Sequence, residues 1–383
     1  MQLNPAVRRI AASPISVAKS YVPYRAGRRP FLDLSQAAPS YPPAPVVEAH
    51  IAATAHDPAG ARYAPVMGLP GLRQTFSQVL SADYRGTVEA QHVHIVAGCN
   101  QAFCSASSAL AGPGDEIIVV SPYYFNHVMW LQAQQITPVL VPIGADGLLS
   151  PAELEAKLTN RTRAILLVSP GNPTGLTITA DTIAAVADLA RSNDIALILD
   201  ETYRNFRDSS EPAHDLFAER DWTDTLISLH SFSKDLAIPG YRVGAIVAGT
   251  DVLEEVAKIQ DCVAISAPTI GQEAALIGLQ EAGEWRCEQV DRILGTLTAF
   301  RQVMAGEPGG FKLVHSGAFF GWVKHPFETR STDDVVRTLV TEHDALAIPG
   351  TAFTEGDEGF IRCSFANLEP DQLTDFAHRL TKL

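Results

Sequence analysis

The chain has 383 residues, 46% of them hydrophobic and 19% charged, which is enough to bury a large core and to form one large and one smaller domain. Its formal net charge of −14 and its pI of about 5.2 argue against nucleic acid and anionic membranes as partners. The cysteines show neither CxxC pairs nor metal-ligand spacings, so we expect free thiols and no metal site: Cys99, Cys104, Cys262, Cys287 and Cys363.

The first 45 residues are rich in proline, which predicts an extended arm with little regular structure of its own. We expect this arm, residues 1–45, to join the smaller domain. No apolar run long enough for a signal peptide or a membrane span follows Arg8 and Arg9, so the sequence indicates a cytoplasmic protein.

Alternating elements begin at about residue 46. Short apolar strands are predicted at residues 92–97, 116–120, 163–168, 195–199, 225–230 and 243–248, and amphipathic helices at residues 101–110, 126–135 and 179–192. Continuous apolar strands between helices are typical of an α/β fold with a mainly parallel sheet covered on both faces. We expect this large domain to span residues 46–280.

The pattern changes after residue 280. A long helix is predicted over Glu284–Met304, and strands follow near residues 317–323, 345–348 and 360–365, with helices between and after them. This succession predicts a smaller α+β domain over residues 281–383.

Ligands of parallel sheets bind at the carboxyl ends of the strands, so the loops at those ends form the candidate site. They carry Gly98-Cys99-Asn100, Ser121-Pro-Tyr-Tyr124, Ser169–Gly175, Asp200-Glu-Thr-Tyr203 and Ser231-Phe-Ser-Lys234. Asp200 ends an apolar strand, where a carboxylate is costly unless it caps a helix or meets a positive partner. A protonated pyridine nitrogen is such a partner, since at ~3 Å and an effective dielectric of ~20 the pair is worth about 5 kcal/mol.

Lys234 follows a predicted strand in a loop of small hydroxyl residues. Most lysines lie on the surface, but a desolvated lysine has a lowered pKa and can form a Schiff base. Arg242 lies between Gly240 and Gly244, and these glycines allow the backbone to come close to a ligand. The guanidinium of Arg242 could then bind a phosphate with two hydrogen bonds. The helix that opens after Gly98 adds a second anion-binding element.

These motifs, in this order from about Pro30 to Arg362, resemble those of the class I and II aminotransferases, enzymes of PLP fold type I that use pyridoxal 5′-phosphate (PLP). The resemblance implies that Lys234 binds the cofactor covalently and then transfers protons, and that Asp200 pairs with the pyridine nitrogen. It implies that Tyr203 and Asn172 bond the phenolic oxygen of the cofactor. It also implies that Tyr124 stacks on the ring.

The resemblance assigns further residues to the cofactor, the substrate and a second subunit. His127 supports Asp200 from behind, and Arg362 binds the substrate α-carboxylate beside Asn172 and Ala38. The residues implied around the phosphate are Gly98, Cys99, Asn100, Ser231 and Arg242. Two more, Tyr63 and Ser266, resemble residues that reach the phosphate of a neighbouring subunit, which implies a homodimer.

Two departures from the family pattern bear on the substrate. Ala38 lies in Gln36-Ala-Ala-Pro39, where a glycine is usual, so the edge of the pocket is narrower. Aspartate-type relatives place a basic residue at one of two positions, which are Cys262 and Asn100 here. The sequence therefore predicts an aminotransferase acting on an amino acid and a 2-oxo acid, without specificity for dicarboxylates.

The sequence bears on three other functions. Lyases, cyclases and synthases that eliminate β or γ substituents share nearly the same residues on this fold, so the motifs leave them open. A PLP-binding regulator without turnover is disfavoured, because no basic helix-turn-helix extension is present. A nicotinamide-dependent dehydrogenase is disfavoured because no G-x-G-x-x-G follows a strand.

Overall fold

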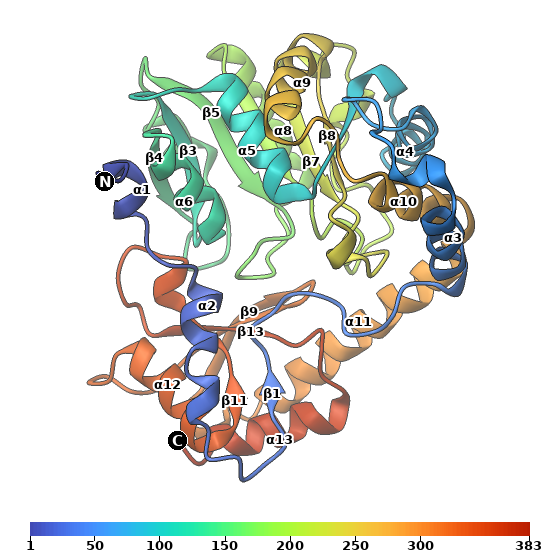
Figure 1. Ribbon diagram of the computed structural model, residues 1–383. Coiled ribbons are helices and arrows are strands. Elements are labelled where there is room, and N and C mark those ends of the chain that lie inside the picture. Colours follow the sequence, from blue (N-terminus) through green and yellow to red (C-terminus); the bar gives the residue numbers. More distant parts are fainter.

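The computed structural model describes residues 1–383 and shows two sheet-based parts joined by a long helix (Figure 1). The first part holds a seven-stranded sheet in the order β2-β8-β7-β6-β5-β3-β4. Its strands are β2 (Val93–Val96), β3 (Glu116–Ser121), β4 (Thr137–Pro142), β5 (Thr162–Val168), β6 (Ala196–Asp200), β7 (Leu226–Ser231) and β8 (Gly244–Val247). Neighbouring strands are parallel except where β8 is a partner. The predicted α/β class with a mainly parallel sheet is confirmed.

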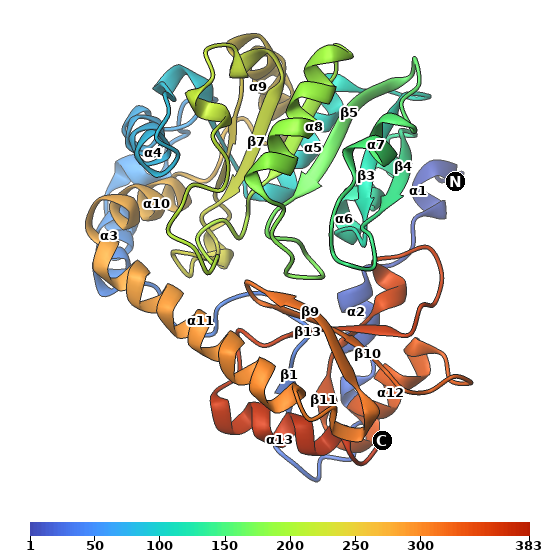
Figure 2. The same cartoon turned by 180° about the vertical axis from the view of Figure 1, so that it is seen from behind.

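Helices cover both faces of this sheet (Figure 1, Figure 2). On one face lie α5 (Cys99–Leu110), α6 (Phe125–Ala133) and α9 (Thr250–Ala264). On the other lie α3 (Pro45–His56), α4 (Pro70–Asp83), α7 (Pro151–Glu155), α8 (Ala180–Ser192) and α10 (Thr269–Glu281). Because successive side chains of a strand point to opposite faces, Leu199 packs toward α4 and α8, and Asp200 lies on the α5 face.

The second part is α+β, as predicted, and holds a four-stranded antiparallel sheet in the order β12-β13-β10-β9. Its strands are β9 (Lys312–Gly317), β10 (Phe320–Lys324), β12 (Ile348–Pro349) and β13 (Phe360–Ser364). The helices α11 (Gly283–Met304), α12 (Thr332–His343) and α13 (Pro370–Leu380) surround a hydrophobic cluster separate from those of the first part. No helix of the structure combines the length and the apolar character needed to cross a membrane.

Some predicted elements differ from the observed ones. The strand expected at residues 317–323 is a hairpin, because β9 ends at Gly317 and Ala318 adopts a positive φ of 45° before β10 begins. The strand expected at residues 345–348 is divided between two sheets, with β11 (Ala345–Leu346) pairing with the arm. The edge strand β4 was not predicted; it is only partly buried and contains two prolines.

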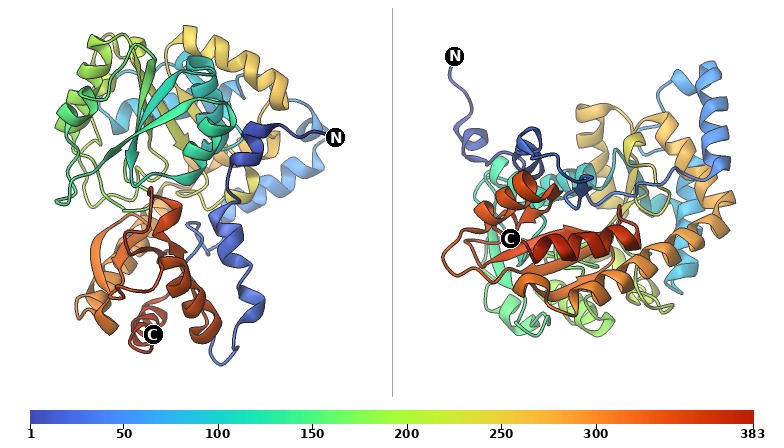
Figure 3. Two further views of the ribbon diagram at one scale, coloured as in Figure 1. Left: turned by 90° about the vertical axis from the view of Figure 1, so that its left-hand side faces the viewer. Right: turned by 90° about the horizontal axis from the view of Figure 1, so that it is seen from below.

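The arm has little regular structure, as predicted, in the form of two short helices and one short strand. The arm contains α1 (Pro5–Arg9), α2 (Pro14–Lys19) and β1 (Leu32–Asp33), which pairs with β11 in a parallel ladder. Both helices begin with proline, which is tolerated in the first turn because no hydrogen-bond donor is needed there. The arm descends from beside α6 along the second part and then turns back toward the middle of the molecule (Figure 3).

Candidate functional site

A cavity of about 270 Å³ lies at the carboxyl ends of the parallel strands, beneath residues 36–38 of the arm. It is lined by Gln36, Ala38, Cys99, Asn100, Tyr124, Val168, Asn172, Asp200, Thr202, Tyr203, Ser231, Ser233, Lys234, Pro239 and Arg242. Most of the residues that the sequence singles out therefore meet in one place.

Asp200 is a buried carboxylate, 4% exposed, that ends β6 at this cavity. Its Oδ1 accepts hydrogen bonds from the amide of Thr202 at 2.9 Å and from the thiol of Cys99 at 3.5 Å, and its Oδ2 lies 3.3 Å from Nε2 of His127. Burial alone would raise the pKa of Asp200, but the interactions with His127 and Thr202 outweigh it and hold that pKa below its usual value. The cavity therefore contains a buried negative charge, and its contact with the side chain of Cys99 was not expected.

Lys234 lies in the loop after β7, and its Nζ donates a hydrogen bond to the carbonyl oxygen of Ala37 at 2.7 Å. Burial, followed by the positive charges of Arg242 and Arg362, lowers the pKa of Lys234 to about 8. A larger fraction of this lysine is therefore uncharged near neutral pH than of an exposed one, and an uncharged amine is a nucleophile.

A cradle for an anion lies beside Lys234 and depends on a glycine. Gly98 precedes the first turn of α5 with a φ of +88°, and a Cβ atom there would lie 2.4 Å from Nη2 of Arg242. Arg242 is held by the carbonyl oxygens of Pro239, at 2.9 Å, and Ala97, at 3.4 Å. The guanidinium and the amino end of α5 thus face the cavity together with Ser231, an arrangement that suits a phosphate.

Arg362 is 1% exposed, and its guanidinium lies 5.4 Å and 5.1 Å from the ring centres of Phe320 and Phe353. It donates to Oδ1 of Asn172 at 3.1 Å and to the carbonyl oxygen of Ser35. Burial lowers the pKa of Arg362 to about 10, so the side chain still carries its charge at neutral pH. None of its hydrogen bonds reaches a carboxylate, which leaves this charge available to a carboxylate of a ligand.

Tyr203 and Tyr124 form part of the cavity wall. Tyr203 is buried, with its ring 5.3 Å and 5.0 Å from those of Phe319 and Phe320, and burial raises its pKa. Tyr124 precedes α6, and its ring lies 5.1 Å from that of His127 at an angle of 89°.

Tyr63 and Ser266 do not line this cavity. Tyr63 is 78% exposed and belongs to a separate surface hollow, whereas Ser266 is 8% exposed. The sequence missed other contributors, above all the carbonyl oxygens of Ala37 and Ser35, which no side-chain pattern signals.

Comparisons with known proteins identify the family of this chain. The family model described as aminotransferase class I and II matches residues 29–380. An aromatic aminotransferase from Arabidopsis thaliana is 32% identical over 337 residues, which cover 85% of this chain and 82% of that protein. An aspartate aminotransferase from Pyrococcus horikoshii is 27% identical over 328 residues, covering 84% of this chain and 82% of that protein. A solved mutant of the Thermus thermophilus aspartate aminotransferase shares the fold, with a TM-score of 0.91 at 22% identity over 100% of this chain and 99% of that one.

Proposed function

This chain belongs to the class I and II aminotransferases, and we propose that PLP is its cofactor and that Lys234 holds it covalently. The proposal rests above all on the half-buried amine of Lys234, whose pKa is lowered to about 8, in one cavity with the buried carboxylate of Asp200. The residues fit the cofactor: the cradle at Gly98 and Arg242 suits its phosphate, and Asp200 suits a protonated ring nitrogen. When bound, PLP supplies an electron sink that stabilises negative charge at the substrate α-carbon.

The protein side chains would bind the amino acid and move its proton. Arg362 would bind the α-carboxylate, and Asn172 and the carbonyl of Ser35 would keep the guanidinium in place. Nζ of Lys234 would accept the α-proton of the substrate and later return a proton to the reacting group. Tyr203 would donate its hydroxyl hydrogen to an oxygen of the bound cofactor, because burial keeps that hydroxyl protonated.

Reduction with borohydride tests the covalent attachment. A pyridoxyl group should be fixed on the peptide that contains Lys234, and labelling of another lysine would contradict the proposal. A single turnover with an amino acid should then yield pyridoxamine 5′-phosphate and a 2-oxo acid in equal amounts. Elimination enzymes on this fold would instead release the substituent of the side chain and regenerate PLP.

We propose further that the amino donor is neutral or aromatic. Asn100 lines the cavity without a positive charge, and Cys262 lies exposed outside it. Two arginines of the arm are paired elsewhere, since Arg25 lies 3.9 Å from Asp344 and Arg29 lies 3.5 Å from Asp375. A buried carboxylate without a partner costs several kcal/mol, so aspartate and glutamate should be disfavoured by ~10²-fold or more.

The donor proposal is tested by kcat/KM for aspartate, glutamate, phenylalanine, leucine, methionine and arginine. The similarity to an aromatic aminotransferase supports a preference for phenylalanine, whereas the aspartate aminotransferases among the relatives argue for the opposite. A clear preference for aspartate or glutamate would contradict the proposal. Lys19 would then be the first residue to replace by methionine, because its Nζ lies 2.7 Å from Oε1 of Gln36 at the cavity.

We propose that the active unit is a homodimer, in which Tyr63 and Ser266 of each subunit reach the phosphate site of the other. Tyr63 is exposed and does not line the cavity of its own chain, which supports this role for Tyr63. We also propose that the chain divides into an arm (1–45), a cofactor-binding domain (46–280) and a smaller domain (281–383). Separate hydrophobic clusters around the two sheets support this division.

A further inference from the structure

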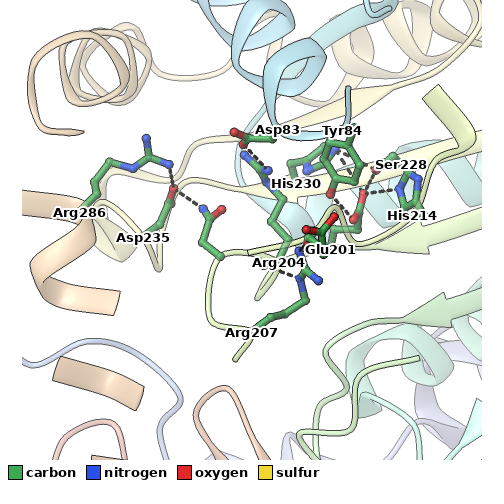
Figure 4. Close-up of polar contacts among 12 residues, drawn as sticks. Asp83, Tyr84, Glu201, Arg204, Arg207, His214, Ser228, His230, Asp235 and Arg286 are labelled. Carbon is green, nitrogen blue, oxygen red and sulfur yellow. Dashed lines mark hydrogen bonds and ion pairs between the residues drawn. The ribbon is translucent and has the colours of Figure 1, made fainter. Parts of the chain in front are cut away.

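A second buried carboxylate, Glu201, lies directly after Asp200 but on the α4 face of the sheet (Figure 4). It is 2% exposed, and it does not line the cavity. We refer to the residues bonded around it as the Glu201 cluster, which consists of Tyr84, Glu201, His214, Ser228 and His230. The strand period of two explains why neighbouring carboxylates have entirely different surroundings.

Glu201 is the final acceptor of the hydrogen bonds in the Glu201 cluster. The hydroxyl of Tyr84 donates to Oε1 of Glu201, and Ser228 Oγ donates to Oε2 at 2.6 Å. Nε2 of His214 lies 3.4 Å from the same Oε2. Because Ser228 spends its only hydrogen on Glu201, His230 must donate its Nε2 hydrogen to Ser228 Oγ over 2.8 Å. The chain of contacts thus leads from His230 through Ser228 to Glu201.

Glu201 and His230 both have strongly shifted pKa values. Burial alone would raise the pKa of Glu201, but the contact with His214 and the hydrogen bond from Ser228 outweigh it and keep the carboxyl ionised. Burial lowers the pKa of His230 to about 3, so that ring is neutral at physiological pH. A buried ionised carboxylate with several donors is expensive to displace, because a shift would leave its charge unpaired.

The Glu201 cluster joins the two strand ends that border the cavity. Glu201 follows Asp200 at the end of β6, and His230 precedes Ser231 at the end of β7. Asp200 is the proposed contact of the ring nitrogen, and Ser231 is a proposed contact of the phosphate. The same hydrogen-bonded chain therefore braces, from the opposite face of the sheet, the two points between which the cofactor would be held.

We propose that Glu201 is a positioning residue, which through Ser228 and His230 fixes the spacing between Asp200 and Ser231 and thereby sets the affinity for PLP. This inference rests on the roles proposed above for Asp200 and Ser231. Displacements of about 0.5 Å are sufficient to weaken a preorganised site.

The experiment compares Ser228→Ala and Glu201→Gln with a matched control, Glu116→Gln. Glu116 is also a buried carboxylate of the same sheet, 4% exposed and bound to Thr159 and Arg161, but it begins β3 at the end of the strands away from the cavity. The dissociation constant of PLP is measured at a temperature where each variant is folded, together with the pH titration of the bound cofactor's absorbance. Each of the two cluster variants removes a hydrogen bond to a charged group, so both should weaken PLP binding ~10-fold or more and shift the titration.

The control should lose thermal stability and keep wild-type affinity for PLP. If Glu201→Gln does not fold, Ser228→Ala decides alone. Wild-type affinity in the cluster variants, alongside weakened binding in Asp200→Asn, would overturn the inference and leave the proposed function standing. Wild-type affinity in Asp200→Asn as well would contradict the proposed function itself. Equal weakening in Glu116→Gln would show a general loss of stability and would also overturn the inference.

Discussion

Replacing Asp200 by asparagine keeps the shape of the side chain and removes its charge. The amide oxygen of the new residue can still accept from the backbone amide of Thr202, so the turn after β6 should be retained. His127, 3.3 Å away, can become the acceptor of the new amide group by changing its tautomer. The substitution should therefore act on the electrostatics of the cavity more than on the fold.

The expected magnitude follows from the distance between the charges. A carboxylate ~3 Å from a protonated ring nitrogen, at an effective dielectric of ~20, contributes about 5 kcal/mol, and part of this is recovered by the neutral amide. A remaining loss of a few kcal/mol in the barrier corresponds to ~10²-fold or more in turnover. Single-turnover kinetics with saturating amino acid measures this step, with Glu116→Gln as the control for stability. Wild-type rates in Asp200→Asn would refute the assignment of this carboxylate to the ring nitrogen.

Three further predictions concern Lys234 and the assembly. Lys234→Ala should lose turnover by several orders of magnitude, because proton transfer loses its base, and borohydride should fix no pyridoxyl group on that peptide. Since only the uncharged amine attacks an aldehyde and the pKa of Lys234 is about 8, binding of PLP to the cofactor-free protein should accelerate ~10-fold per pH unit below about pH 8 and level off above it. A rate independent of pH between 6 and 8 would contradict that reasoning. Light scattering at assay concentration should show a dimer, and a fully active monomer would refute the shared site.

The sequence predicted those residues of the candidate site that lie at or just after the end of a strand. Asp200 and Lys234 follow apolar runs, and runs of that kind form parallel strands whose carboxyl ends meet. The arm shows the limit of this reasoning. Its proline density predicted an extended arm, but the residues of the arm that touch the site, Ser35 and Ala37, act through carbonyl oxygens. Any residue supplies a carbonyl oxygen, so no choice of side chain records that contact.

Glu201 shows a different limit. In the sequence, Asp200-Glu-Thr-Tyr203 is a single polar segment after a strand, and the period of two already implies that Asp200 and Glu201 cannot face the same side. What the period cannot supply is the set of donors that makes the second carboxylate tolerable, because Tyr84 comes from the end of α4 and His214 from a distant loop. Burying the charge of Glu201 requires these partners. Because they hold Glu201 in place, it can in turn hold the neighbouring Asp200 in position on the opposite face of the sheet.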